Sequence, residues 1–285
     1  MLRSYKKYYD YAQFTRGFTY DTMRGKVSSI NHFVAHTRIK SLEEVTSDMI
    51  NEWMEYQTIN DCQPRTVNNR LKHVLAMIRY YRDYGMEIPG FRRGQIVKQK
   101  EHDPNRRAFS RETIYEALKY ADRETWLMIK IAFDCGLRIK ELRNIRLRDI
   151  NGRQIRIFGK GGKQRFVLLS DEVMVRLHNL IQRYDLHDYL WASTTKPSSP
   201  KSENTIRRKM QAAFKAAGVY GMCPHELRHS YATDLKRLGA STRSIQYGMG
   251  HSTERITERY LHDLDPSDLE ELYALKYSAA APEII

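Results

Sequence analysis

The 285-residue chain has little cysteine and lacks any long apolar run. Its three cysteines, Cys62, Cys135 and Cys223, are odd in number and far apart, which argues against a disulfide framework and favours a reducing compartment. No stretch approaches the roughly 18 apolar residues that cross a membrane, and the first residues lack the apolar run of a secretory signal. We therefore expect a soluble, cytoplasmic protein with no membrane partner.

Acidic residues are also few, and they are unevenly placed. The chain has 48 Lys and Arg against 34 Asp and Glu, a net charge of +14. Residues 1–95 contain 15 basic and 10 acidic side chains, and residues 96–260 contain 32 and 18, whereas residues 261–285 contain 1 and 6. A basic body of this size indicates a polyanionic partner such as nucleic acid. The alternative is an ordinary basic protein, and the acidic end looks like a separate functional piece.

The first part of the chain has the apolar periodicity of helices. One pattern covers Tyr20–His36, a second follows a possible cap at Thr46, and a third opens at Pro64. Basic side chains flank the apolar stripe of the third helix, where they could contact phosphates or simply form a solvated face. The candidate DNA contacts on this helix are Arg65, Arg70, Lys72 and Arg79.

The pattern changes in the second part of the chain. Residues 93–108 have no apolar periodicity and read as a basic linker, and Ser110 can cap the helix that follows. From Gln154 the apolar period becomes two, and a glycine-rich turn over 159–163 predicts a β-hairpin. Helical patterns then return, ending in an acidic helix near 266–276. We expect a mainly α fold with a small antiparallel sheet.

The predicted organisation has four parts. A helical DNA-binding domain covers 1–92, the linker 93–108, a second domain 109–262, and an acidic helix or tail 263–285. We expect these residues to need no metal and no cofactor.

Four separated pieces of the second domain have side chains suited to one reaction. They contain Arg138 after Gly-Leu, Lys163 in the hairpin turn, His225 and Arg228 in one short segment, and His251 with Tyr260 nine residues later. Attack on a phosphodiester places extra negative charge on the non-bridging oxygens, which fixed arginines stabilise. A tyrosine hydroxyl is a possible nucleophile once a base or a cationic site activates it. A lysine could protonate the leaving 5′ oxygen, and histidines could bond phosphate oxygens or relay a proton.

Taken together, the pieces Gly-Leu-Arg138-x-x-Glu-Leu, Gly-Lys-Gly-Gly-Lys163-x-Arg, His225-x-Leu-Arg228-His, Gly-His251 and Tyr260 have a specific order and spacing. The chain resembles the tyrosine recombinase family of Xer and phage-type integrases over residues 109–262, and more faintly over the helical first half, which is similar to that family's SAM-like core-binding domain. The resemblance implies that Tyr260 forms a 3′-phosphotyrosyl link with DNA. It also implies that four protomers exchange strands on two double-stranded sites through a Holliday junction, without metal or ATP. The free protein would be a monomer or weak oligomer, nucleoid-associated when bound, and the acidic tail could dock on a neighbouring protomer.

Several assignments stay open at this point. Lys160 lies in the same turn as Lys163 and could replace it as the acid, although the motif position favours Lys163. Further candidate DNA contacts are Arg106, Arg107, Lys160 and Arg165. Residues 225–229 also spell the zinc-peptidase motif His-Glu-x-x-His. A DNA-relaxing enzyme of type IB chemistry is a rival function, and so is a non-catalytic DNA-binding relative.

Overall fold

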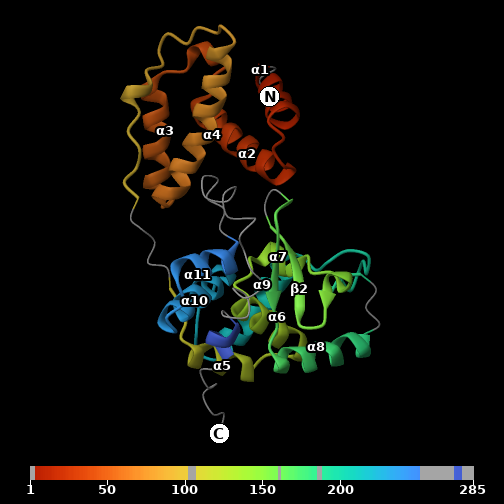
Figure 1. Ribbon diagram of the computed structural model, residues 1–285. Coiled ribbons are helices and arrows are strands. Elements are labelled where there is room, and N and C mark those ends of the chain that lie inside the picture. The colour runs from red at the N-terminus through yellow and green to blue at the C-terminus, as the bar shows by residue number, and fades with distance from the viewer. Residues whose placement is uncertain (1–3, 102–106, 160–161, 185–187, 251–272, 278–285) are drawn as a thin grey trace. The chain divides into compact units, whose positions relative to one another are not determined.

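The computed structural model describes residues 4–101, 107–159, 162–184, 188–250 and 273–277. The chain forms two compact units, Met1–Pro104 and Asn105–Ile285 (Figure 1), and each has its own hydrophobic core. The described residues are mostly helical with one three-stranded antiparallel sheet, so the predicted fold class is confirmed.

The described part of unit 1 consists of helices joined by loops and contains no strand. Its elements are α1 (Ser4–Asp10), a π-helical turn η1 (Tyr11–Thr15), α2 (Tyr20–Thr37), the 3-10 turn η2 (Leu42–Glu44), α3 (Ser47–Ile59), α4 (Pro64–Asp83) and the 3-10 turn η3 (Arg93–Gln95). The predicted helices correspond to α2, α3 and α4, whereas the sequence patterns gave no sign of α1. Thr46 caps α3 as expected, because its hydroxyl accepts the Met49 N–H, and Pro64 opens α4.

The core of unit 1 lies between α2, α3 and α4. Trp53 is fully buried, packs edge-on against Phe33, and donates its indole N–H to Nδ1 of His32 at 2.9 Å. The chain after α4 then returns along this unit. Ile96 is buried, and Asn68 donates to the carbonyl of Gln99 at 2.8 Å. The first part of the predicted linker therefore packs on unit 1.

Unit 2 contains the sheet and the remaining helices. Its elements are α5 (Arg111–Lys119), α6 (Arg123–Asp134), α7 (Ile139–Arg143), the 3-10 turn η4 (Leu147–Asp149), β1 (Ile150–Asn151), β2 (Gln154–Phe158), β3 (Gln164–Leu168), α8 (Asp171–Tyr184), α9 (Glu203–Ala216), α10 (Pro224–Arg237) and α11 (Thr242–Met249). Residues 273–277 are helical as well. Ser110 caps α5 as predicted, since its hydroxyl accepts the Thr113 N–H. The predicted helix over 253–262, and most of the one over 266–276, lies outside the described residues.

Helix α6 is the centre of unit 2. Every residue from Thr125 to Asp134 is buried, and α8, α9 and α10 all contact this helix (Figure 1). A helix that is covered on all sides is expected to be mostly apolar, and the run from Trp126 to Phe133 is apolar except at Lys130, which is buried against Asp134. The predicted hairpin is β2 paired with β3, and β1 extends it to three strands in the order β1-β2-β3.

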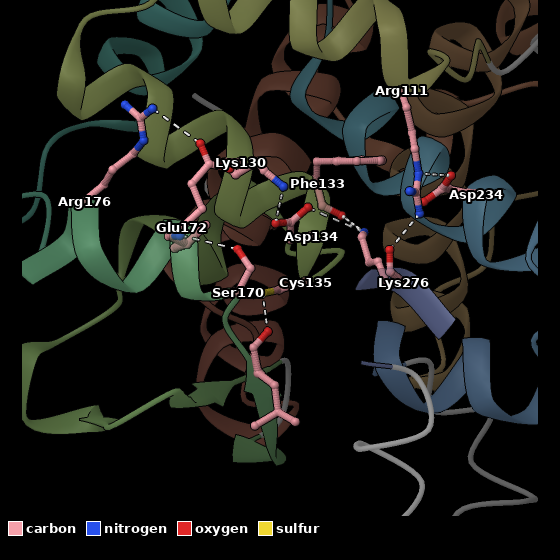
Figure 2. A network of polar contacts seen from close by, with 12 residues as sticks. Arg111, Lys130, Phe133, Asp134, Cys135, Ser170, Glu172, Arg176, Asp234 and Lys276 are labelled. Atoms are coloured by element: carbon pink, nitrogen blue, oxygen red, sulfur yellow. Dashed lines mark hydrogen bonds and ion pairs between the residues drawn. The ribbon is translucent and has the colours of Figure 1, made fainter. Parts of the chain in front are cut away.

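A buried polar network joins the end of α6 to residues 273–277 (Figure 2). The Lys130 amine lies 2.7 Å from Asp134 Oδ2, and the Lys276 amine lies 3.8 Å from Asp134 Oδ1 while donating to the Phe133 carbonyl. Arg111 pairs with Asp234 at 2.8 Å and donates to the Lys276 carbonyl. Burial lowers the pKa of Lys276 to about 8. These contacts hold residues 273–277 on their own unit.

Candidate active site

Arg138 stands at the start of α7, where a close helix contact shapes the backbone before it. Gly136 has φ +59°, and a Cβ atom there would lie 2.5 Å from the ring of Tyr231, so only glycine fits. The chain then turns at the buried Leu137 and presents Arg138 as the N-cap of α7. The Arg138 side chain is 36% exposed, so it reaches solvent.

Glu141 joins the cationic side chains of this region. Its Oε1 accepts from Nη1 of Arg138 at 2.6 Å, and its Oε2 accepts the Arg138 backbone N–H at 3.0 Å. The same Oε2 lies 2.9 Å from Nη2 of Arg165 and 3.9 Å from Nη1 of Arg228. Burial alone would raise the pKa of the Glu141 carboxyl, but the hydrogen bonds and charges of Arg165 and Arg138 outweigh it and lower that pKa. Glu141 is therefore an anion among three guanidinium groups.

Sequence reasoning gave Glu141 no role. The residue was visible in the Gly-Leu-Arg138-x-x-Glu-Leu piece, three positions after the arginine. That spacing is the one at which a glutamate reaches back to the backbone N–H of the N-cap residue, here Arg138. This capping position is the feature of the sequence that could have indicated a structural role for Glu141.

Arg228 comes from the middle of α10 and is 1% exposed. Its Nη1 donates to the carbonyl of Gly136 at 2.6 Å, and its Nη2 donates to the carbonyl of Met249 at the end of α11. Burial, followed by the positive charge of Arg138, lowers the pKa of Arg228 to about 10. The guanidinium thus joins the turn before Arg138 to the end of α11.

The hairpin places Lys163 at its exposed end. Phe158 pairs with Gln164, and beyond that pair the Gly159 N–H donates to the Lys163 carbonyl at 2.7 Å. Gly162 has φ +76°, the left-handed conformation that a tight turn requires of glycine. The start of the turn lies near Glu141, because a Cβ atom on Gly159 would be 3.7 Å from Glu141 Oε1. Lys160 lies outside the described residues.

Helix α10 also holds the two histidines of the zinc-peptidase motif. His225 is exposed, and its ring lies 5.5 Å from that of His229. Glu226, the catalytic base in a zinc peptidase, here accepts the Cys223 N–H at 2.7 Å and pairs with Arg107 at 3.1 Å. Its carboxylate is committed to capping α10, which does not favour the peptidase. Within the described ranges, no group of three or more His, Cys, Asp or Glu side chains could hold a metal ion.

Two predicted site residues, His251 and Tyr260, lie outside the described residues. The chain reaches them through Gly250, the last described residue before them, which ends α11 with φ +59°. This left-handed cap is typical of glycine. The structure therefore brings Arg138, Arg228, the Lys163 hairpin and the approach to His251 around Glu141.

The candidate DNA contacts differ in exposure. Arg65, Lys72 and Arg79 are exposed on α4, whereas Arg70 is half-buried and donates to Gln57 at 2.9 Å. Arg165 is only 8% exposed, so its guanidinium faces the protein interior and not the surface. Arg107 is exposed and ion-paired with Glu226, and Arg106 lies outside the described residues.

No helix in the described ranges has the length and apolar character to cross a membrane.

The arrangement can stabilise an oxyanion. A guanidinium forms planar, bidentate bonds to phosphate-like oxygens and keeps its charge. Glu141 fixes the orientation of Arg138 through Nη1, while the Arg138 side chain as a whole stays 36% exposed. An anionic group bound there would meet oriented donors that need no reorganisation.

Comparison with known proteins gives a consistent result. Residues 107–266 match the model of the phage integrase family. Tyrosine recombinase XerC of Staphylococcus epidermidis is 32% identical over 144 residues, 48% of each chain. Tyrosine recombinase XerD of Pseudomonas aeruginosa is 34% identical over 156 residues, 52% of each. The chain spans about half the length of these curated relatives.

Solved structures show the same fold. A lambda integrase dimer bound to a COC′ core site has a TM-score of 0.72 and 18% identity, covering 90% of this chain and 75% of that one. The XerH site-specific recombinase in a post-cleavage complex with palindromic difH substrate has a TM-score of 0.67 and 20% identity, covering 89% and 79%. The family model matches more than half of the sequence, including the elements that hold Arg138, Glu141, Lys163 and Arg228. The chain belongs to the phage integrase family.

Proposed function

We propose that this protein is a site-specific DNA recombinase that cuts and rejoins strands through a covalent link to Tyr260. The observation that supports this most is the group of guanidiniums held by Glu141, with Arg138 still partly exposed, beside the hairpin of Lys163. Its relatives are named tyrosine recombinases, and solved structures of the same fold are complexes with recombination sites. The substrate is double-stranded DNA.

The cleavage step follows from the chemistry of the residues. The Tyr260 hydroxyl passes its proton to a histidine of the site, His225 or His251, or to water, and its oxygen attacks the scissile phosphorus, while the bond from phosphorus to the 5′ oxygen breaks. Lys163 gives a proton to that leaving oxygen, so a 3′-phosphotyrosyl link and a free 5′ hydroxyl result. Arg138 and Arg228 stabilise the charge that develops on the non-bridging oxygens, together with His225 and His251.

Arg228 must change partners for this role. Both of its terminal nitrogens donate to backbone carbonyls, those of Gly136 and Met249. A phosphate oxygen would be a stronger, charge-assisted acceptor than either carbonyl. We infer that DNA binding shifts the end of α11 and redirects this guanidinium.

Strand exchange completes the reaction. The 5′ hydroxyl of a partner strand attacks the phosphotyrosyl phosphorus, a new phosphodiester forms, and the Tyr260 oxygen leaves and regains a proton. Four protomers on two DNA sites would pass through a Holliday junction, in the cytoplasm and without metal or ATP. In this proposal, residues 1–92 form a DNA-binding domain and residues 109–262 form the catalytic domain. Residues 263–285 form an element that docks on a neighbouring protomer. The acidic stretch over 263–271 lies outside the described residues.

Covalent capture tests the nucleophile. A nicked duplex that loses its 5′ product after cleavage should trap the protein on DNA, and Tyr260→Phe should abolish the adduct while DNA binding persists. Tyr120→Phe is the matched control, because Tyr120 is exposed at the end of α5 and should leave the adduct unchanged. An adduct of full yield in the Tyr260→Phe variant would disprove this nucleophile.

Two further outcomes separate recombination from its rival functions. Relaxation of a supercoiled plasmid that has no recombination site would favour a topoisomerase of type IB chemistry. Activity that a chelator removes and zinc restores would favour the peptidase motif. DNA binding should weaken steeply with salt, because phosphate contacts release counterions.

A further inference from the structure

Arg165 occupies an inward position of strand β3. Burial alternates along the strand, with Gln164 and Phe166 exposed and Arg165 and Val167 buried. Arg165 pairs in the ladder with Ile157, which is also buried. A strand with this alternation points its arginine into the protein and its phenylalanine outward, the reverse of what the residue types favour. A buried charge of this kind needs a specific partner.

The partner of Arg165 is the carboxylate of Glu141. Nη2 of Arg165 lies 2.9 Å from Oε2, and both side chains are almost fully buried. Glu141 in turn holds Arg138 at 2.6 Å. The ion pair therefore connects the strand that leaves the Lys163 turn with the start of α7.

The other side of the Arg165 guanidinium contacts the turn at Gly250. A Cβ atom on Gly250 would lie 2.8 Å from Nη1 and 3.2 Å from Cδ and Cζ of Arg165. The Nε donor, which lies between those two carbons, is buried and has no hydrogen-bond partner among the described residues. The guanidinium thus fills the space directly under the residue that precedes His251.

We propose that Arg165 is a positioning residue for strand cleavage, whose buried guanidinium holds the Lys163 hairpin in register with Arg138, through Glu141, and with the Gly250 turn. This inference rests on the proposed function. Without Arg165, the described part of the hairpin loses its ion pair with Glu141, and the β2–β3 ladder and the approach of Gly159 to Glu141 remain to place the turn. The lysine then loses its fixed relation to the phosphate that Arg138 binds, and a displacement of about 1 Å can cost roughly 10²-fold in rate.

The test compares two leaving groups in single-turnover cleavage. One nicked duplex has the natural 5′ bridging oxygen, and the other has sulfur there, which leaves as a thiolate and needs no proton. Arg165→Gln should cleave the oxygen duplex about 10²-fold more slowly than wild type. It should cleave the sulfur duplex at close to the wild-type rate, because the contribution of a general acid, about 10²–10⁴-fold, is no longer required.

Controls separate positioning from general damage. Arg156→Gln removes a guanidinium from another buried carboxylate of the same unit, Asp149, which it contacts at 2.7 Å, and should leave both rates unchanged. If Arg165→Gln does not fold, Arg165→Lys serves in its place. It keeps the charge, but a single ammonium cannot both bond Glu141 and fill the space at Gly250, so it should show the same selective loss.

Three results would overturn the inference. Equal loss on both duplexes would mean that Arg165 acts on the phosphate or on folding and not on the acid. Wild-type rates in Arg165→Gln would mean that it has no role, and unfolding of both Arg165 variants would mean a purely structural one. Failure of the wild-type protein to cleave either duplex would instead reject the proposed function itself.

Discussion

Two buried carboxylates in unit 2, Asp134 and Glu141, are surrounded by different kinds of cation. Asp134 faces the amines of Lys130 and Lys276, whose side chains are 3% and 5% exposed. Glu141 faces guanidiniums, and one of them, that of Arg138, is 36% exposed. We call the Asp134 group sealed because its carboxylate and both amines belong to almost fully buried side chains. We call the Glu141 group open because the Arg138 side chain reaches solvent.

The side-chain chemistry accounts for this difference. A guanidinium has five N–H donors in a planar fork, so it can satisfy a buried carboxylate with one edge and present another edge to a ligand. A lysine amine is a compact charge, and Lys130 and Lys276 direct theirs at Asp134 and the Phe133 carbonyl. We infer that the Glu141 group serves chemistry and the Asp134 group serves folding.

Asp134→Asn should have the largest effect on stability. Two buried ammonium groups would lose the carboxylate between them, and removal of one partner from a buried ion pair costs about 3–5 kcal/mol. Chemical denaturation would measure this loss, and the protein that remains folded should cleave DNA at close to the wild-type rate. Asp188→Asn, at a half-exposed pair with Arg146, should cost less than about 1 kcal/mol. Equal losses in the two variants would contradict the distinction between a sealed and an open group.

Arg138→Ala should show the opposite profile. The side chain is partly exposed, so unfolding should change little, but the loss of one oriented donor should slow cleavage about 10²–10³-fold. Single-turnover cleavage and denaturation on the same preparation would measure both quantities. Arg176→Ala, which removes an exposed arginine that pairs with Glu172 and stacks on Trp126 away from Glu141, is the control for the loss of an arginine elsewhere in unit 2. A large loss of stability with a small loss of rate would mean that Arg138 belongs with the folding residues.

Sequence patterns predict Arg138, Lys163 and Arg228 as site residues because the motifs that contain them have a specific order and spacing. The period of two also predicts the hairpin, and the structure has Lys163 at the end of that hairpin. The same patterns assign no role to Glu141, since its partners Arg165 and Arg228 come from β3 and α10 and approach it only in the folded unit.

Arg165 shows where residue type misleads. Its basic side chain made it a candidate DNA contact, but the period of two that predicts the strand also places residue 165 on the same, buried face as Val167. Periodicity was the better guide there. Nothing comparable pointed to Asp134, because its partner Lys276 is far along the chain and only the folded structure brings the two together.

The pH dependence of stability should reveal the sealed group most directly. Burial lowers the pKa of Lys276 from 10.5 to about 8 in the folded protein, so between these values the unfolded chain binds more protons. The free energy of unfolding should therefore rise with pH from about 8 to 10.5, by up to about 1.4 kcal/mol per pH unit from this group, and the cost of burying the charge remains in full below pH 8. Lys276→Met should lack that rise. The comparison is clearest from pH 8 to 9, because the Cys135 thiol, which lies in the field of Lys276 and whose pKa burial raises to about 12, begins to ionise in the unfolded chain near pH 9. Denaturation curves at pH 7, 8, 9 and 10 would measure this rise in the free energy of unfolding.

Parallel pH profiles of stability for wild type and Lys276→Met would show that the Lys276 amine keeps its ordinary pKa. Residues 273–277 would then not hold that amine in a buried site.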